Sequence, residues 1–198
     1  MSVFGLDRTR TFAHCQLCPG QADRVPMPTP PTPITSLDQL VSALKHGPGR
    51  TGYLEILDRI SIPWSQFEPY CRWHDKHYTR TCIARTNAFE LLLICYEPGQ
   101  RTSIHDYATE EAWVHPVFGA VIEERFEPGP EGPLRKVSSA KLDPGSFSYL
   151  HNGHGIHRYV NPNKERSVTL NLYAKPLSKW KVYDERSGET HSRVAGEP

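Results

Sequence analysis

Two histidine-containing stretches of the chain have the residue types and the spacing of a metal site. The first, GQRTSIHDYATEE (residues 99–111), places His105 and Tyr107 two residues apart, and the second, GSFSYLHNGHGIHRYVN (residues 145–161), contains His157. On a β-strand, side chains at i and i+2 point to the same face, and a histidine from a later strand could complete a set of three ligands. Such a set leaves coordination positions open for substrate and oxygen, as non-haem iron chemistry requires.

The segments that would position these residues are short strands separated by turns. From about Tyr78 onward, β-rich runs alternate with Pro-Gly and Asn-Gly turns, which is typical of a sandwich or a small barrel. The runs are 88–96, 112–126, 134–142, 145–151, 157–160, 166–174 and 180–184. Near the end of the series, leucines alternate with Thr169, Asn171 and Tyr173, so one face of this strand is apolar and the other polar. We therefore expect an all-β barrel with a polar pocket inside.

The region before the strands has a different composition. Residues 1–35 are Pro-rich and lack periodicity, which predicts a weakly ordered N-terminal segment, and we expect the folded domain over residues 36–198. The pattern that begins at Ser36 is a capping box and predicts a short helix. A second capping box begins at Ser65 and predicts another short helix, which Pro69 could distort.

The bulk composition is that of an ordinary globular protein. Of 198 residues, 37% are hydrophobic and 23% are charged, and the formal net charge is +1, which gives no reason to expect a nucleic acid or membrane partner. No apolar run reaches membrane-spanning length and no signal-peptide pattern begins the chain, so we expect a cytoplasmic protein. The cysteine count is five, an odd number that argues against a disulfide framework. Cys15 and Cys18 form a C-x-x-C that could be half of a zinc site, but no second C-x-x-C follows, so we interpret them as two free thiols.

The two histidine stretches resemble the two cupin motifs, and five segments narrow the resemblance to the cysteine dioxygenase family. In chain order, the segments are YTR (78–80), FELLLICYEPG (89–99), SIHD (103–106), GIHR (155–158) and VTLNLY (168–173). With their flanks they cover roughly residues 36–190, and several short matches in one order are more specific than a single H-x-H. The resemblance implies a cupin jelly-roll barrel with short N-terminal helices.

The resemblance also implies a role for each matching residue. The family binds Fe(II) through three neutral histidines and adds both atoms of O2 to the sulfur of cysteine, so His105 and His157 are expected to be metal ligands. Arg80 matches the arginine that holds the substrate carboxylate, which a planar guanidinium can bind through two hydrogen bonds. Tyr78 matches a tyrosine of the pocket wall, and Tyr173 matches the tyrosine whose hydroxyl points at the thiol and the oxygen.

Three features depart from the family pattern. Tyr107 stands where the family has its second histidine ligand. Ala112 stands where the animal enzymes have a cysteine joined to the active-site tyrosine, so no Cys–Tyr thioether can form there. The family's supporting row of Ser, His and Tyr becomes Thr169, Asn171 and Tyr173, which removes a titratable hydrogen-bond partner of the tyrosine hydroxyl.

The departure at Tyr107 leaves four arrangements open. Tyr107 could bind the metal as a phenolate, which would favour higher oxidation states and change the metal preference. Alternatively, the site could consist of His105, His157 and water. His154, which we otherwise expect beside the ligands, could also take the third position, or the site could hold no metal. Fe(II) is the first expectation for the metal, and nickel and copper are the alternatives.

Three functions stay open at this level. The first is the oxidation by O2 of L-cysteine, or of a close thiol, to the sulfinate. The second is a divergent biosynthetic cupin that oxidises cysteine to another product, such as a sulfonamide, with another metal such as nickel. The third is a non-catalytic cupin that binds a thiol or a metal. The presence of Arg80 and Tyr173 favours an enzyme, whereas the loss of the second histidine favours the other two functions.

Overall fold

The computed structural model describes residues 31–49, 52–107, 111–129, 132–151 and 155–194, without the side chains of Tyr107 and His151. The predicted weakly ordered segment lies outside the described residues apart from residues 31–35, and Cys15, Cys18 and His154 lie outside them as well. The main compact unit of the chain begins at Thr32. Within it, Ile34 is buried and pairs with Ile60 in an isolated β-bridge.

Short helices precede the strands. They are α1 (Leu37–Lys45), α2 (Leu54–Leu57) and the 3-10 turns η1 (Trp64–Gln66) and η2 (Glu68–Tyr70). The first predicted helix is confirmed, and Ser36 caps it: its hydroxyl accepts a hydrogen bond from the Gln39 amide at 3.1 Å. The reciprocal half of the capping box is shifted by one residue, because Oε1 of Gln39 accepts from the amide of Thr35 rather than from that of Ser36. The second predicted helix is wrong in detail: Ser65 lies inside η1, and Pro69, which has no N–H to donate, falls in a separate 3-10 turn.

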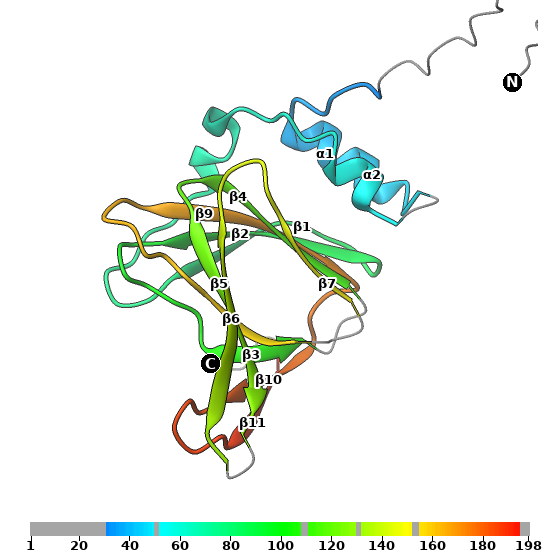
Figure 1. Ribbon diagram of the computed structural model, residues 1–198. Coiled ribbons are helices and arrows are strands. Elements are labelled where there is room, and N and C mark those ends of the chain that lie inside the picture. Colours follow the sequence, from blue (N-terminus) through cyan, green and yellow to red (C-terminus); the bar gives the residue numbers. More distant parts are fainter. Residues whose placement is uncertain (1–30, 50–51, 108–110, 130–131, 152–154, 195–198) are drawn as a thin grey trace, which may run out of the picture. The chain divides into compact units, whose positions relative to one another are not determined.

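The described strands form two antiparallel sheets (Figure 1). The first sheet contains, in spatial order, β1 (Thr79–Arg85), β2 (Phe89–Tyr96), β9 (Ser167–Ala174), β4 (Glu111–Phe118) and β7 (Ser148–His151). The second sheet contains β11 (Thr190–Val194), β10 (Lys179–Tyr183), β3 (Ile104–Tyr107), β8 (Ile156–Val160), β5 (Val121–Pro128) and β6 (Leu134–Leu142).

From β2 to β10, the chain crosses between the sheets at every step except the β5–β6 hairpin, which is the connectivity of a jelly roll. β2, β4, β7 and β9 belong to the first sheet, whereas β3, the β5–β6 hairpin, β8 and β10 belong to the second. The predicted all-β cupin jelly roll with short N-terminal helices is therefore confirmed. The described strands form two facing sheets rather than a single closed ring.

Sequence periodicity located most strands but not all of them. The predicted run 112–126 is divided into β4 and β5 by a turn at Gly119. Gly119 has φ +63°, and a Cβ atom there would lie 2.6 Å from the carbonyl oxygen of Arg166, so the turn requires glycine. β1, β3 and β11 were not among the predicted runs, because they are short or carry mixed polar residues on both faces.

Two apolar clusters, one on each face of the first sheet, hold the fold together. On the outer face, leucines of β2 and β9 pack with Trp113 and with Leu40 and Leu44 of α1. On the inner face, between the sheets, the cluster includes Ile94, Tyr96, Val114, Tyr159 and Tyr173. Complete burial of one such leucine contributes roughly 1.5–3 kcal/mol. The apolar face of β9 is thus turned to the helices, and its polar face is turned to the space between the sheets.

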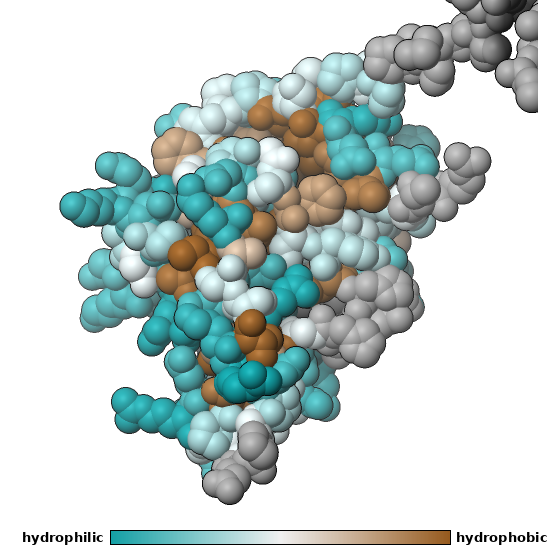
Figure 2. Space-filling model, in the orientation of Figure 1, coloured by the Kyte–Doolittle hydropathy of each residue, from teal (hydrophilic) through white to brown (hydrophobic). Residues whose placement is uncertain are grey.

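One face of the molecule is mostly polar. On the face shown in Figure 2, hydrophilic side chains predominate and hydrophobic ones form separate patches. Among the described residues, no helix has the length and apolar character needed to cross a membrane.

Candidate metal centre and substrate pocket

The two histidines predicted to bind a metal lie directly opposite each other on neighbouring strands. His105 of β3 and His157 of β8 are register partners, and their ring centroids are 4.5 Å apart at an interplanar angle of 55°. Both side chains are buried. The structure therefore brings together two residues that are distant in sequence.

Backbone hydrogen bonds determine the tautomer of both rings. Nδ1 of His105 donates to the carbonyl oxygen of Ser103 at 2.7 Å, and Nδ1 of His157 donates to that of Gly155 at 2.6 Å. A carbonyl can only accept, so the proton of each neutral ring is on Nδ1 and the lone pair is on Nε2. Burial is the main cause that lowers the pKa of His105 to about 3 and that of His157 to about 4. Both rings are neutral at pH 7, as metal ligation requires.

The third ligand position is not determined by the described side chains. Tyr107 is the last residue of β3, two positions after His105, and its side chain is outside the described set, as is His154. Within the described part of the chain, no group of three or more His, Cys, Asp or Glu residues could hold a metal ion. The two histidines lie side by side in the neutral state that metal ligation requires, and their role as ligands and the identity of a third ligand stay predictions.

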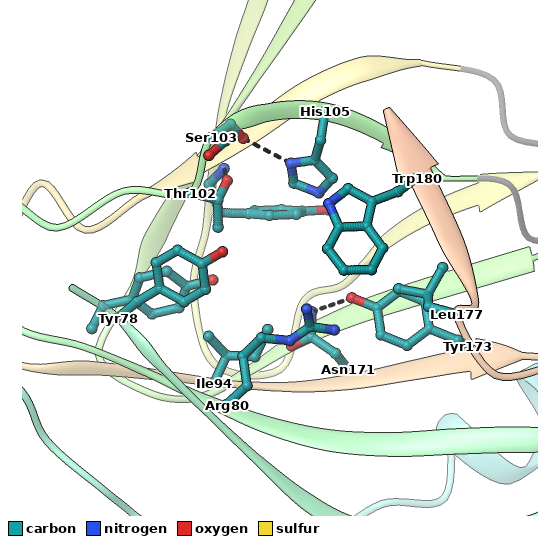
Figure 3. A pocket seen from close by; sticks show the side chains of 12 residues that line it. Tyr78, Arg80, Ile94, Thr102, Ser103, His105, Asn171, Tyr173, Leu177 and Trp180 are labelled. Carbon is teal, nitrogen blue, oxygen red and sulfur yellow. Dashed lines mark hydrogen bonds between the residues drawn. The ribbon is translucent and has the colours of Figure 1, made fainter. Parts of the chain in front are cut away.

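A small cavity of about 50 Å³ lies between the sheets beside His105 (Figure 3). From the first sheet it is lined by Arg80, Ile94, Tyr96, Asn171 and Tyr173, with Tyr78 just before β1; from the second sheet and its connections it is lined by Thr102, Ser103, His105, Tyr159, Leu177 and Trp180. Three residues predicted from the family resemblance to serve the substrate therefore lie around one cavity: Tyr78, Arg80 and Tyr173.

Arg80 supplies a positive charge to this cavity. Its guanidinium carbon lies 5.8 Å from the centroid of the Trp180 ring, and its charge contributes to the lowered pKa of His105. The arginines that form ion pairs within the described residues are Arg85, Arg125, Arg135, Arg158 and Arg166. Arg80 is not in this group, so among the described side chains no carboxylate neutralises it.

The polar face of β9 forms a continuous row of hydrogen bonds, which we call the β9 row: Thr169, Asn171 and Tyr173. The Thr169 hydroxyl donates to Oδ1 of Asn171 at 2.7 Å, and Nδ2 of Asn171 donates to the Tyr173 hydroxyl oxygen at 3.4 Å. Ala112 of β4 is the register partner of Tyr173, so the residue that replaces the family's cysteine lies next to this tyrosine. Within the described part of the chain, the row thus supports Tyr173 through two neutral side chains.

Sequence reasoning missed a second polar group between the sheets, which we call the Glu123 cluster: Glu123, Arg125, Ser148 and Tyr159. Oε1 of Glu123 accepts hydrogen bonds from Ser148 at 2.9 Å and Tyr159 at 3.4 Å, and Nη2 of Arg125 lies 3.2 Å from it. The Tyr159 ring meets the His157 ring edge-on at 5.3 Å. The cluster therefore supports the strand that carries His157.

A signal for these missed residues was present in the alternation of two strands. In Val121–Pro128, Glu123 is two positions after the buried Val121 and so shares its face. In Lys179–Tyr183, the two lysines alternate with Trp180 and Val182, which places the tryptophan on the inner face.

Comparison with known proteins places this chain in a family. The sequence model of the cysteine dioxygenase type I family matches residues 59–186, and the chain therefore belongs to the cysteine dioxygenase type I family. Cysteine dioxygenase type 1 of Rattus norvegicus is 27% identical over 137 residues, which cover 67% of this chain and 68% of the rat protein. The Homo sapiens protein of the same name is 26% identical over 137 residues, with the same coverage. Membership supports an oxidoreductase and suggests thiol dioxygenase activity.

Solved structures with a similar backbone are more distant. A conserved protein with a double-stranded β-helix domain from Klebsiella pneumoniae has a TM-score of 0.46 and 14% identity, covering 66% of this chain and 88% of that chain. A cupin superfamily protein from Desulfitobacterium hafniense has a TM-score of 0.43 and 14% identity, covering 54% and 84%.

Proposed function

We propose that this protein is a metal-dependent thiol dioxygenase that oxidises L-cysteine, or a closely related small thiol, to the sulfinate. One observation carries the proposal: Arg80, with no acidic partner among the described residues, lines the same small cavity as the buried, neutral His105. A carboxylate site and a metal-ligand site thus share a space suited to a small molecule. The reaction R–SH + O2 → R–SO2H balances without any other reductant.

Each residue of the pocket would have a separate role in this reaction. Arg80 would bind the substrate carboxylate, and Tyr78 and Tyr96, whose rings stack at 5.8 Å, would form a wall of the pocket. The β9 row would keep the Tyr173 hydroxyl directed towards the thiol. His105 and His157, with Tyr107 as the proposed third ligand, would hold iron, which when bound supplies the redox chemistry with O2 that the side chains lack.

The direct test is a combined assay on purified protein. We expect about one iron per chain by elemental analysis, uptake of O2 when L-cysteine is added, and a product that is heavier than cysteine by two oxygen atoms. A His105→Ala, His157→Ala double variant should lose both metal and uptake. Full activity without a metal would refute the proposed metal site. A metal-loaded protein that consumes no O2 would refute the proposal that the protein is an enzyme.

A second test addresses the carboxylate. Arg80→Lys keeps the charge but loses the planar pair of donors, so the kcat/KM for L-cysteine should fall by about 10- to 100-fold, as expected for a lost charge-assisted hydrogen bond. Cysteamine, which has no carboxylate, should be affected little. Equal losses with both thiols would show that Arg80 is structural.

The alternative of another oxidation product is favoured by Tyr107 and Asn171, which replace two histidines of the family pattern. Tyr107→Phe should weaken metal binding if the phenolate is a ligand, and Tyr107→His should raise sulfinate formation. Mass spectrometry of the product separates the two enzymes: a product other than the sulfinate would select the divergent oxidase. If Tyr107→Phe retains metal and turnover, Tyr107 is not a ligand.

A further inference from the structure

Trp180 is a pocket residue for which the family resemblance assigns no role. It lies on β10 between the exposed Lys179 and Lys181, and it is half-buried with its ring in the wall of the cavity. Its ring centroid is 5.8 Å from the guanidinium carbon of Arg80. Figure 3 shows the two side chains facing each other, Arg80 from the first sheet and Trp180 from the second.

The contact between these side chains constrains the arginine. A guanidinium over an indole is attracted by the electrons of the ring, and tryptophan is the best such partner. Arginine otherwise has many rotamers, and ordering a flexible side chain during binding reduces affinity. Because the Arg80 guanidinium carbon lies over the indole ring and this contact uses none of its N–H donors, the donors stay available for a carboxylate.

The indole also limits the length of the pocket. The cavity is only about 50 Å³, and Trp180 and the buried Leu177 form its wall on the side where Arg80 would hold a carboxylate. A substrate held by Arg80 must therefore reach His105 within this small space. An additional methylene group would press against these side chains, since packed walls accommodate one poorly.

We propose that Trp180 is the specificity-determining residue of this pocket, which holds Arg80 in a carboxylate-binding orientation and excludes thiol acids longer than cysteine. This inference rests on the proposed function, because it names the substrate class of the same site: short thiols that carry a carboxylate. Trp180 acts on the carboxylate through Arg80 and on substrate length by direct contact.

The experiment compares Trp180→Ala and Trp180→Phe with Lys179→Ala, an exposed neighbour on the same strand. Metal-loaded protein is titrated without oxygen with L-cysteine, L-homocysteine and cysteamine, and dissociation constants are measured by calorimetry. For Trp180→Ala we expect L-cysteine to bind about 2- to 30-fold more weakly. Cysteamine affinity should change less than about 2-fold, and the ratio of homocysteine to cysteine affinity should rise by about 10-fold. The affinities of Trp180→Phe should lie between those of Trp180→Ala and those of the unaltered protein. The affinities of Lys179→Ala should equal those of the unaltered protein.

Each result decides the inference. Equal weakening of cysteine and cysteamine by Trp180→Ala, or an unchanged homocysteine ratio, overturns it. If Trp180→Ala fails to fold, the same comparison with Trp180→Phe decides. O2 uptake is measured in parallel with the unaltered protein. If cysteine binds with the expected variant pattern but no O2 is taken up, the proposed reaction is refuted and the role of Trp180 is supported. If cysteine does not bind, both the proposed reaction and the role of Trp180 are refuted.

Discussion

Two buried polar groups lie between the sheets, and they are built in opposite ways. The β9 row runs along a single strand and consists of neutral side chains joined in one direction. The Glu123 cluster joins β5, β7 and β8 around one carboxylate, which accepts hydrogen bonds from Ser148 and Tyr159 and pairs with Arg125. Both groups contain residues that are almost completely buried.

The difference shows how each group serves the site. A neutral hydroxyl or amide needs only one or two hydrogen bonds to be tolerated inside a protein, whereas a buried carboxylate needs a cation and several donors. The β9 row can therefore orient Tyr173 with little effect on the rest of the fold. The Glu123 cluster ties three strands together and should affect the stability of the protein more strongly.

The largest effect should come from removal of the buried charge. Glu123→Leu leaves the Ser148 and Tyr159 hydroxyls without their acceptor and Arg125 without its ion pair. We expect a loss of about 3 kcal/mol in the free energy of unfolding, measured by urea titration. The control is Glu127→Ala, which removes an exposed ion pair with Arg135 and should cost less than about 1 kcal/mol. Similar costs for both variants would contradict the contrast.

Interruption of the neutral row should cost less. Asn171→Leu removes the acceptor of the Thr169 hydroxyl and the donor to Tyr173, and we expect a loss of about 1–3 kcal/mol. Cysteine turnover should fall further than stability explains, because Tyr173 loses its support. A variant with intact turnover would show that the row does not orient the tyrosine.

A third variant tests Glu124, the neighbour of Glu123 on β5. Glu124 forms ion pairs with Arg158 and Lys136. Burial opposes its ionisation, but the hydrogen bonds from Lys136 and Arg158 prevail and lower its pKa below the ordinary 4.5. Its stabilising contribution is therefore complete above pH 4.5 and is lost as the pH falls through the lowered value.

Glu124→Gln should consequently be less stable than the unaltered protein at pH 7, by about 1 kcal/mol. The difference should shrink as the pH falls below about 4.5. Urea unfolding at pH 7, 5 and 3.5 measures it. A difference that is independent of pH would show that the glutamate acts through packing rather than charge.

The smallest effect should come from the edge of the Glu123 cluster. The hydrogen bond from Tyr159 to Glu123 is long, at 3.4 Å, so Tyr159→Phe should cost only about 0.5 kcal/mol. The ring that contacts His157 is retained, and metal content should not change. A loss of stability as large as that of Glu123→Leu would show that the Tyr159 hydroxyl, and not the Glu123 carboxylate, contributes most to the stability of the cluster.

Local patterns in the sequence predicted most of the fold. Alternating leucines identified β9, and the Ser36 capping box identified α1, because both signals depend on neighbours along the chain. β3 is only four residues long, too short for a period to be read with ease. It was recognised through the spacing of its histidine and tyrosine and not as a run of its own.

The site was predicted where a family motif covers it and missed where contacts come from the fold. Arg80 and His105 belong to motifs, and both line the cavity. Trp180 and Glu123 have no motif, and their importance depends on which strands lie opposite them. The roles of the predicted residues, the third ligand and the domain boundary at residue 36 stay predictions.

The pairing of His105 with His157 has a consequence for local unfolding. In the described residues, the register between β3 and β8 consists of this one pair, whereas β3 is paired along its whole length with β10, and β8 is similarly paired with β5. The edge formed by β3, β10 and β11 is thus joined to β8 at the two predicted metal ligands and, just before β3, by the Arg101–Val160 bridge and the hydrogen bond from the Thr102 amide to the Tyr159 carbonyl. A cation bound by both histidines would link β3 to β8, and its removal should accelerate amide hydrogen exchange in β10 and β11 far more than in β2 and β9.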